Sequence, residues 1–301
     1  MSQPDRSGHR KAVVLMIVTT ALWSVAGVVT RHLSPSLRAD GRFEIAFWRA
    51  LFAAIFVGAY LLAVRREGLR PVREAGGAGL VSGLMWAIMF TTFMVALTLT
   101  TVANTLIVMS VGPLVTALLA RAVLRTPVPA RTWAAIAAAT AGIVWMFAGG
   151  AVQGPGRALG MAIALAIPLA QAVNLVTLKK SHAHVDLVPA VLLGGAIAAL
   201  AMLPLALPFR ADLRDIALLA GLGFFQLGLP CMLMVVAARR LAAPEVALLG
   251  LLEVVLGPIW AWIGAGEAPE TPTLAGGALV LSALALNEAA ALLGQRWRAR
   301  A

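Results

Sequence analysis

The feature that most constrains this sequence is a series of apolar runs, each about 20 residues long and separated by short polar segments. A helix needs roughly that length to cross the hydrocarbon core of a membrane. The chain is 61% hydrophobic and 12% charged, which is too little charge to cover a soluble domain. We therefore predict an all-α polytopic membrane protein with ten transmembrane helices. The expected spans are residues 12–31, 43–64, 76–97, 103–124, 131–149, 158–178, 187–207, 215–238, 244–265 and 272–293.

The distribution of basic residues predicts the orientation of these spans. Lysine and arginine number 24 against 13 acidic residues, for a net charge of +11. They gather between the apolar runs, a pattern typical of contacts with anionic membrane lipid and not of a nucleic-acid surface. With the N-terminus inside, 17 of the 24 lie on the cytoplasmic side. We expect a multi-pass protein of the bacterial inner membrane with both termini in the cytoplasm, and Val13–Val29 retained as the first helix.

Two segments of the chain align without gaps at an offset of 141 residues. Residues 103–126 read ANTLIVMSVGPLVTALLARAVLRT, and residues 244–267 read PEVALLGLLEVVLGPIWAWIGAGE. Each combines an apolar segment that contains a proline with a short polar turn, but the first turn is basic and the second is acidic. The same unit therefore faces opposite sides of the membrane. We predict two inverted five-helix repeats, residues 1–150 and 151–301, an arrangement typical of secondary transporters.

Four stretches of the sequence are similar to a known family. They are Trp23, FWRALFAA with Arg49, ALTLTTVANTLIVMSVGP, and LLEVVLGPIWAWIGAGEAP followed by a glycine pair. Together they resemble the drug/metabolite transporter superfamily, its EamA-type ten-helix exporters and most of all the aromatic amino-acid exporter (YddG-like) group. The resemblance implies a central cavity enclosed by the first, third, fourth, sixth, eighth and ninth helices. Two positions depart from the family pattern: Thr126 replaces a common Glu, and Val254 follows Glu253 where Pro is frequent.

The sequence contains no motif for covalent catalysis or nucleotide binding. It lacks G-x-S-x-G, H-E-x-x-H and a glycine-rich loop ending in lysine. His182 and His184 could bind a metal weakly, although a solvated loop explains them better. The single cysteine, Cys231, is expected to be a small packed side chain. We expect no enzymatic activity, no cofactor and no resident metal.

Polar residues at membrane depth are the first candidates for a substrate site, because water cannot satisfy them there. Gln171, Asn174 and Thr177 recur every three residues on one face of the sixth span. They either line a cavity or hold helices together. A match of helix ends places Gln171 opposite Trp23 of the other half, and Gln226 adds an amide from the eighth span. We predict substrate contacts for Trp23, Gln171, Asn174 and Gln226.

An aromatic stripe runs along the third span. Trp86, Phe90 and Phe93 are spaced i, i+4 and i+7, so they share one helix face. Such stripes often belong to the core or face lipid. Flanked by methionines such as Met109, they would also suit apolar or aromatic solutes of varied shape. Trp86, Phe90 and Met109 are therefore further candidates for substrate binding.

Glu253 is the one acidic residue near the middle of a predicted span. A carboxylate at this depth indicates a functional site and could carry a coupled proton. The alternative is a hydrogen-bonded glutamate that braces two helices. Arg49 and Glu288 lie nearer to span ends, so we expect both to snorkel to the interface as anchors.

Prolines and small residues predict where the helices bend and where they pack closely. Pro113, Pro168, Pro230 and Pro258 lie in mid-span and are candidate hinges, because proline removes a backbone hydrogen bond. The runs Gly79–Gly83 and Gly276–Gly277 predict close contacts between helices.

Taken together, the sequence predicts a secondary transporter that exports small metabolites by alternating access. Neutral apolar or aromatic amino acids are the first choice of substrate, and the protein is expected to be a monomer or weak homodimer. An exporter of drugs or nucleotide-sugar-like solutes is the alternative in the same class, although basic residues at membrane depth are few. A membrane scaffold or sensor without transport is the alternative of another class, but no loop is long enough for an output domain.

Overall fold

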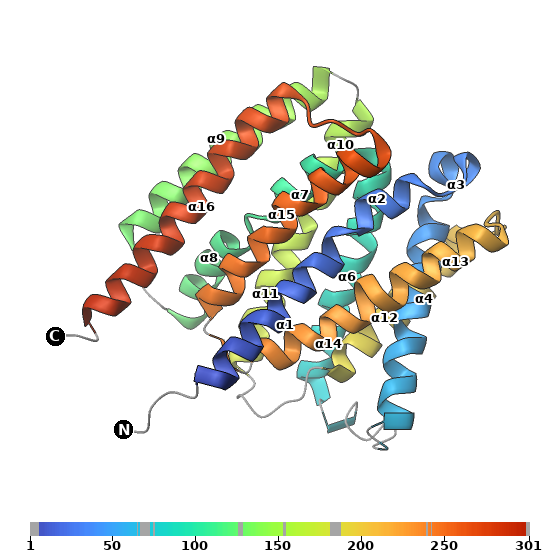
Figure 1. Ribbon diagram of the computed structural model, residues 1–301, viewed down its shortest axis with the longest axis horizontal. Helices are drawn as coiled ribbons and strands as arrows, with labels where there is room; N and C mark the ends of the chain where they lie inside the picture. The colour runs from blue at the N-terminus through green and yellow to red at the C-terminus, as the bar shows by residue number, and fades with distance from the viewer. Residues whose placement is uncertain are drawn as a thin grey trace.

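The computed structural model describes residues 6–64, 66, 73–74, 76–125, 129–152, 155–180, 188–238, 240–241 and 243–298. Within these ranges the chain is helical and contains no strand, and Figure 1 shows the helices as roughly aligned rods. The elements are α1 (Arg6–Ser24), α2 (Ala26–Arg31), α3 (Pro35–Asp40), α4 (Arg42–Ala59), the π-helical η1 (Tyr60–Val64), α6 (Gly76–Leu99), α7 (Val102–Met109), α8 (Gly112–Leu124), α9 (Ala130–Val152), α10 (Pro155–Ala164), α11 (Ala166–Lys180), α12 (Val188–Ala206), α13 (Leu213–Gly221), the π-helical η2 (Leu222–Gly228), α14 (Leu229–Ala238), α15 (Ala243–Ala265) and α16 (Thr271–Arg298).

Across short interruptions, the described helices join into ten rods that coincide with the ten predicted spans. The composite rods are α1–α2, α4–η1, α7–α8, α10–α11 and α13–η2–α14. The expected all-α polytopic class is confirmed. Seven of the described stretches are long and apolar enough to cross a membrane, and α15 and α16 contain shorter apolar stretches, Leu252–Ala265 and Thr271–Asn287. The seven are Gly8–Arg31, Arg42–Val64, Gly76–Leu99, Val102–Val123, Gly156–Asn174, Val188–Ala206 and Leu213–Met234.

The packing of the rods repeats when the two sets of five are exchanged. α1 packs against α14 and α15, and its counterpart α10–α11 packs against α6 and α8. α4 packs against α12, and α9 packs against α16. Each of these pairs consists of corresponding rods, so exchanging the two sets leaves these contacts unchanged. Successive rods run in opposite directions, and α1 begins at the same end of the bundle at which α16 ends (Figure 1). With five rods in each set, corresponding rods are antiparallel, as inverted repeats require.

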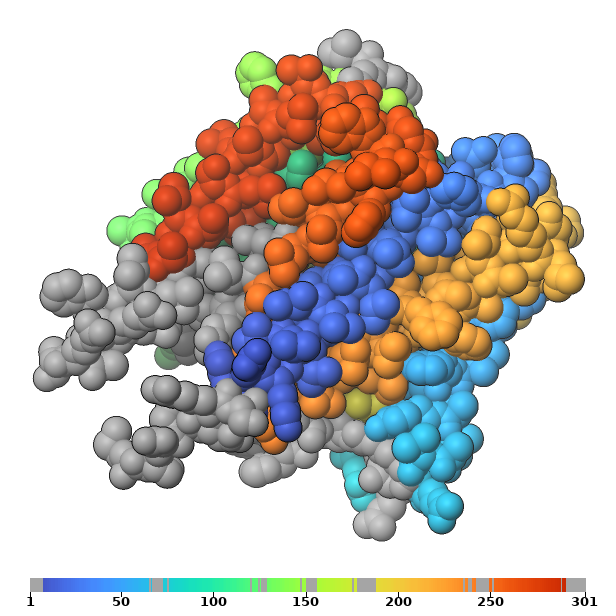
Figure 2. All heavy atoms as spheres, viewed as in Figure 1, coloured from blue at the N-terminus to red at the C-terminus, as the bar shows by residue number. Residues whose placement is uncertain are grey.

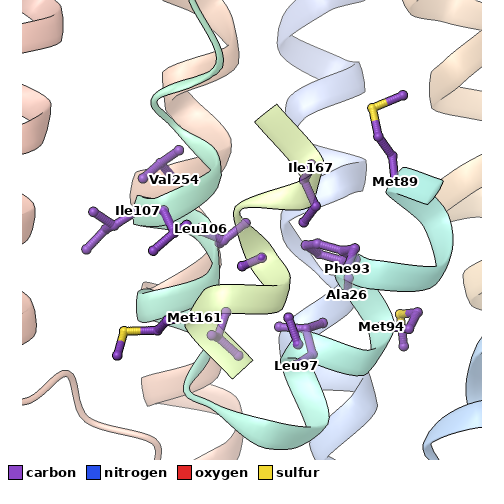
Figure 3. Packing of buried hydrophobic residues seen from close by; sticks show 14 of the residues in the cluster. Ala26, Met89, Phe93, Met94, Leu97, Leu106, Ile107, Met161, Ile167 and Val254 are labelled. Carbon is purple, nitrogen blue, oxygen red and sulfur yellow. The ribbon is translucent and has the colours of Figure 1, made fainter. Parts of the chain in front are cut away.

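The main hydrophobic core lies at the seam between the two sets. It combines residues of α2, α6, α7, α10, α11 and α15, with Phe93 between Ala26 and Ile167 (Figure 3). A second cluster joins α4 to α6, α12 and α14 and includes Phe47, Phe90 and Cys231. Cys231 is buried, as expected for a small packed side chain. Because both clusters draw on both halves, the buried centre of the molecule lies between the repeats.

Large apolar side chains also cover the outside of the bundle. Val144 and Trp145 of α9, Leu200 of α12 and Leu286 of α16 are among the most exposed residues. An apolar exterior of this kind suits contact with lipid. Figure 2 shows α1 at the surface along its length, between α15 and α14.

Glycine permits the closest contacts between helices, as the sequence indicated. A Cβ atom added to Gly83 of α6 would meet Leu193 of α12, and one added to Gly276 of α16 would lie 2.6 Å from the carbonyl oxygen of Gly142 in α9. At Gly142 the added atom would lie 2.7 Å from the carbonyl oxygen of Gly276. The predicted close contacts at Gly83 and Gly276 are confirmed.

Replacing Gly142 by alanine is expected to destabilise the protein by about 1–3 kcal/mol, because the new methyl group must push two backbones apart. Thermal unfolding in detergent measures this as a lower midpoint. Gly250→Ala in α15 is the matched control, since its added Cβ would meet nothing within 4 Å. Equal midpoints for the two variants would contradict tight packing between α9 and α16.

Candidate functional site

The centre of the bundle holds a buried arginine. Arg49 of α4 is 2% exposed, so the expectation that it snorkels to the interface is wrong. Its Nε and Nη2 donate to the Gln226 Oε1 atom at 3.0 and 2.7 Å, and its Nη1 donates to the Phe90 carbonyl oxygen at 3.5 Å. Gln226 in turn donates from Nε2 to the Trp23 carbonyl oxygen at 3.1 Å. One polar network thus joins α1, α4, α6 and η2.

Close packing of α4 against η2 explains why Arg49 cannot reach the interface. A Cβ atom added to Gly223 would lie 2.5 Å from Phe52 Cβ and 2.8 Å from the Arg49 carbonyl oxygen. Gly228 is similarly close to Phe56. Two glycines therefore bring the π-helical segment against the backbone of α4. Gln226, between them, is 2% exposed and faces the guanidinium.

Aromatic side chains of α6 adjoin this network. The Arg49 guanidinium lies over the Phe93 ring, 5.4 Å from its centroid, and the rings of Trp86 and Phe90 are 5.3 Å apart. Phe90 is buried in the second cluster and Trp86 is half-buried against both clusters. Met109 is half-buried against the main cluster. The predicted aromatic stripe therefore lies in the core near the seam, and Phe93, which was not among the predicted substrate contacts, is the ring that meets the charge.

Glu253 brings a second buried charge to this region. Its side chain on α15 is 6% exposed and interacts electrostatically with Arg49. One turn further along α15, a Cβ added to Gly257 would lie 3.7 Å from the Ser24 carbonyl oxygen, and Trp260 Nε1 donates to Ser24 Oγ at 3.0 Å. α15 thus holds Glu253 beside α1, at the seam.

The polar face of the sixth span lies elsewhere. Gln171 of α11 is half-buried and lies against the backbone of Gly112. A Cβ atom added to Gly112 would lie 2.4 Å from the Gln171 Oε1 atom. Asn174 is 6% exposed, and its Oδ1 atom is buried without a hydrogen-bond partner among the described residues. Trp23 contacts Gln226 of η2, whereas Gln171 contacts the α7–α8 junction. The predicted polar candidates therefore form two groups at different junctions.

Three of the four predicted hinge prolines coincide with interruptions in the helices. Pro113 follows the turn between α7 and α8, Pro168 follows the break at Leu165, and Pro230 follows η2. Pro258 lies inside the continuous helix α15. Whether these positions move stays a prediction. A break at Val25, between α1 and α2, has no proline and was not predicted.

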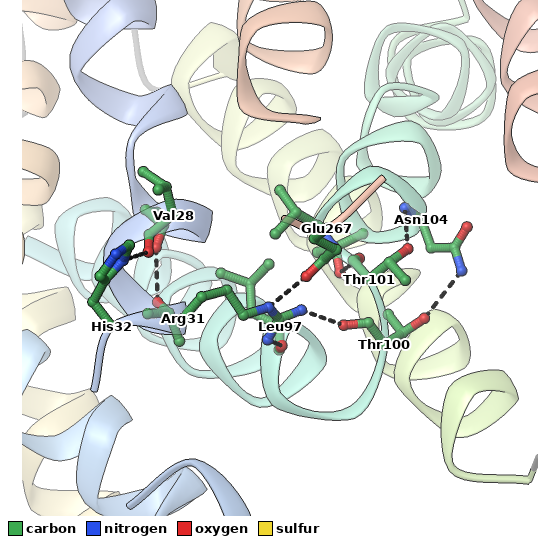
Figure 4. Close-up of polar contacts among 12 residues, drawn as sticks. Val28, Arg31, His32, Leu97, Thr100, Thr101, Asn104 and Glu267 are labelled. Atoms are coloured by element: carbon green, nitrogen blue, oxygen red, sulfur yellow. Dashed lines mark hydrogen bonds and ion pairs between the residues drawn. The ribbon is translucent and has the colours of Figure 1, made fainter. Parts of the chain in front are cut away.

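A polar cluster closes one end of the seam, the end at which α2 and α6 finish (Figure 4). Arg31 Nε forms an ion pair with Glu267 Oε2, and its Nη1 and Nη2 donate to the carbonyl oxygens of Leu97 and Thr100 at 2.7 and 3.0 Å. Glu267 Oε1 accepts from Val102 N at 2.6 Å. We call Arg31 and Glu267 the latch, because these two side chains tie α2 to the α6–α7 and α15–α16 connections.

Further contacts at the same end strengthen this closure. Asn104 of α7 accepts from Thr273 Oγ1 of α16 at 2.7 Å and donates to Thr100 Oγ1 at 3.1 Å. Arg157 of α10 pairs with Glu270 at 2.6 Å. Neither the latch nor these contacts were predicted. Opposite charges at the same predicted end of the bundle, Arg31 and Glu267, were the signal that could have found it.

The sequence comparisons assign the family. The family model described as the EamA-like transporter family matches the chain twice, over residues 10–148 and 158–288. The chain belongs to the EamA-like transporter family. The chain is also similar to a solved crystal structure, with a TM-score of 0.64 and 20% identity over 93% of this chain and 97% of that one. That likeness shows the fold alone. No curated protein matches the sequence.

This EamA-like transporter is thus a multi-pass membrane protein of the drug/metabolite transporter type, with two copies of the family unit. A surface hollow of about 590 Å³ lies beside the start of α1, lined by Arg10, Lys11, Val14 and Leu15. Thr126, at the position that would correspond to the acidic turn, lies outside the described residues, as do His182 and His184. The described residues contain no cluster of metal ligands.

Proposed function

We propose that this EamA-like transporter exports neutral amino acids with apolar or aromatic side chains. The observation that carries the proposal is the meeting of Arg49, Gln226 and Phe93 at the seam, where both repeats contribute to one buried network. A guanidinium beside aromatic rings suits a solute with a negative head and an apolar body.

Alternating access is the mechanism that we propose, and the two copies of the family unit and the latch support it. The latch ties helices together at one end of the seam. Release of the latch, with bending at the junctions near Pro113, Pro168 and Pro230, would expose the network to the opposite side. Transporters with inverted repeats work in this way, because the same unit can adopt either of two packings around a fixed site.

A solute panel in proteoliposomes tests the proposal. Purified full-length protein is reconstituted and uptake is measured for leucine, phenylalanine, a basic amino acid, a nucleotide sugar and a cationic drug, with and without a pH gradient. We expect saturable uptake of leucine and phenylalanine above that of protein-free vesicles. Transport of the nucleotide sugar or the drug alone would move the protein to another substrate class. Uptake of none of them would contradict the proposal.

Replacing Trp23 or Gln171 by alanine is expected to lower phenylalanine flux about tenfold while membrane insertion stays normal. The Trp23 ring packs on the second cluster, and the Gln171 side chain packs against Gly112 at the start of α8. The backbone carbonyl of residue 23 that accepts from Gln226 is kept in the variant, so the test concerns the ring alone. The loss of either side chain leaves a void at a junction that bends in the proposed mechanism. Trp145→Ala, at a side chain 62% exposed on α9, is the matched control. Normal flux in both variants would remove the two residues from the transport path.

A further inference from the structure

No charged group in the described part of the chain hydrogen-bonds to the Arg49 guanidinium, and the buried acid Glu253 acts on it only electrostatically. Among the residues whose burial is described, Arg49 is the one basic side chain that is buried. Its hydrogen-bond partners, the Gln226 amide and the Phe90 carbonyl, are neutral. Burying a charge without a charged hydrogen-bond partner is costly, and an ionisable residue inside a membrane span marks a functional site by default.

The Gln226 amide oxygen occupies the edge of the Arg49 guanidinium at which a carboxylate would bind. A guanidinium carries five N–H donors in a planar fork, and an Nε–Nη2 edge binds the two oxygens of a carboxylate side by side. Here the single Oε1 atom of Gln226 accepts from both Nε and Nη2. The amide oxygen therefore stands where a carboxylate would bind, and it supplies no charge.

Gln226 is placed so that it can leave this position. It lies in η2, a π-helical segment between α13 and α14, and π-helical turns are frequent at functional sites. Apart from Arg49, its side chain is held by one bond, from Nε2 to the Trp23 carbonyl oxygen. Rewinding of η2 would rotate Gln226 away and free the fork beside the Phe93 ring.

We infer that Arg49 is the carboxylate-recognition residue of the transport site, and that the carboxylate of the solute replaces the Gln226 amide oxygen on the Nε–Nη2 edge. The apolar body of the solute then lies against Phe93 and Phe90. This inference deepens the proposed function and rests on it. It commits to a monoanionic carboxylate, because a phosphate ester carries up to two negative charges and Arg49 is the single buried cation among the described side chains.

Analogues of phenylalanine test the recognition on the unmodified protein. Binding is measured by thermal stabilisation of the purified transporter with 3-phenylpropanoate, which keeps the carboxylate, with phenethylamine, which lacks it, and with phenyl phosphate. We expect 3-phenylpropanoate to bind about 10- to 100-fold more tightly than phenethylamine, the range expected for charge-assisted hydrogen bonds. Equal binding of the two analogues, or preference for phenyl phosphate, would overturn the inference.

Variants then assign the preference to Arg49. Arg49→Lys keeps the charge but not the fork, and Arg49→Gln removes both, so we expect the preference for the carboxylate to fall about tenfold in the first and to vanish in the second. Arg214→Gln, at an exposed residue of α13, should keep the wild-type ratio. If neither Arg49 variant folds, the analogue series on the wild-type protein decides alone.

The two proposals fail in different ways. Loss of the carboxylate preference in Arg49→Lys, combined with absence of amino-acid uptake in vesicles, would support the recognition site and reject the proposed substrates. Amino-acid uptake with an unchanged carboxylate preference in Arg49→Lys would keep the proposed function and overturn the role of Arg49.

Discussion

Proteoliposomes that contain the Glu253→Gln variant are expected to exchange solute at nearly the wild-type rate but not to accumulate it when a pH gradient is applied. Glu253 is a buried carboxylate at the seam, where it interacts electrostatically with Arg49. Glutamine keeps its shape but can neither bind nor release a proton. If one proton is exchanged per solute, a gradient of one pH unit supports about tenfold accumulation. The variant should stay at equal concentrations on the two sides.

Exchange and accumulation are measured in the same vesicles with labelled phenylalanine. The exchange assay has solute on both sides of the membrane and no pH gradient, so it measures passage of solute through the protein. Accumulation also requires that solute transport be coupled to proton movement. Asp40→Asn is the control, because that residue lies in an exposed ion pair with Arg210, outside both the seam network and the latch. Gradient-driven accumulation that survives in Glu253→Gln would end the idea that this residue carries the proton. Loss of both activities would indicate a structural brace.

Breaking the latch is expected to open the seam toward the end at which α2 finishes. Arg31 and Glu267 together hold the α6–α7 and α15–α16 connections, and both side chains are about one fifth exposed. We expect such a partly exposed network to contribute about 2 kcal/mol to the closed arrangement. Arg31→Ala or Glu267→Ala should therefore raise the population open at this end roughly thirtyfold.

Cysteine accessibility measures this shift. A reporter cysteine replaces Thr105, which is fully buried one turn inside the latch, in a background in which Cys231 is alanine. A membrane-impermeant maleimide is added from the latched side, and its labelling rate should rise at least about tenfold in either latch variant. Arg210→Ala is the matched control, because Arg210 pairs with Asp40 in an exposed ion pair. Unchanged labelling in both latch variants would show that other contacts keep this end closed.

Much of the architecture could be predicted, because lipid leaves few choices for a chain of apolar runs. Spans of this length must be helices, since each backbone polar group needs a partner inside its own segment. The antiparallel relation of the halves followed from the change from a basic to an acidic turn. The rods and their packing bear this out.

The site was harder to predict, because contacts across helices decide it. Arg49 looked like an anchor by its distance from the end of its span, but the glycines of η2 bring another helix over it. The break at Val25 has no proline. Instead, the Ser24 hydroxyl donates to the Ala21 carbonyl oxygen at 2.7 Å, and a Cβ on Gly27 would lie 2.5 Å from Val102. A hydroxyl bonded to the preceding turn bends helices, and its effect depends on the neighbour that fills the bend.

The difference between the turn that contains Thr126 and the turn that contains Glu267 has a kinetic consequence. A contact inside the protein cannot change the direction of net solute flux, because the gradient alone sets that direction. It does set how long the binding network faces each compartment. A solute that approaches from the latched side meets a competent protein only for a small fraction of the time, so its apparent affinity from that side is reduced by that fraction. Under the proposed alternating access, the acid at Glu267 and the threonine at position 126 predict that the transporter samples the two compartments unequally.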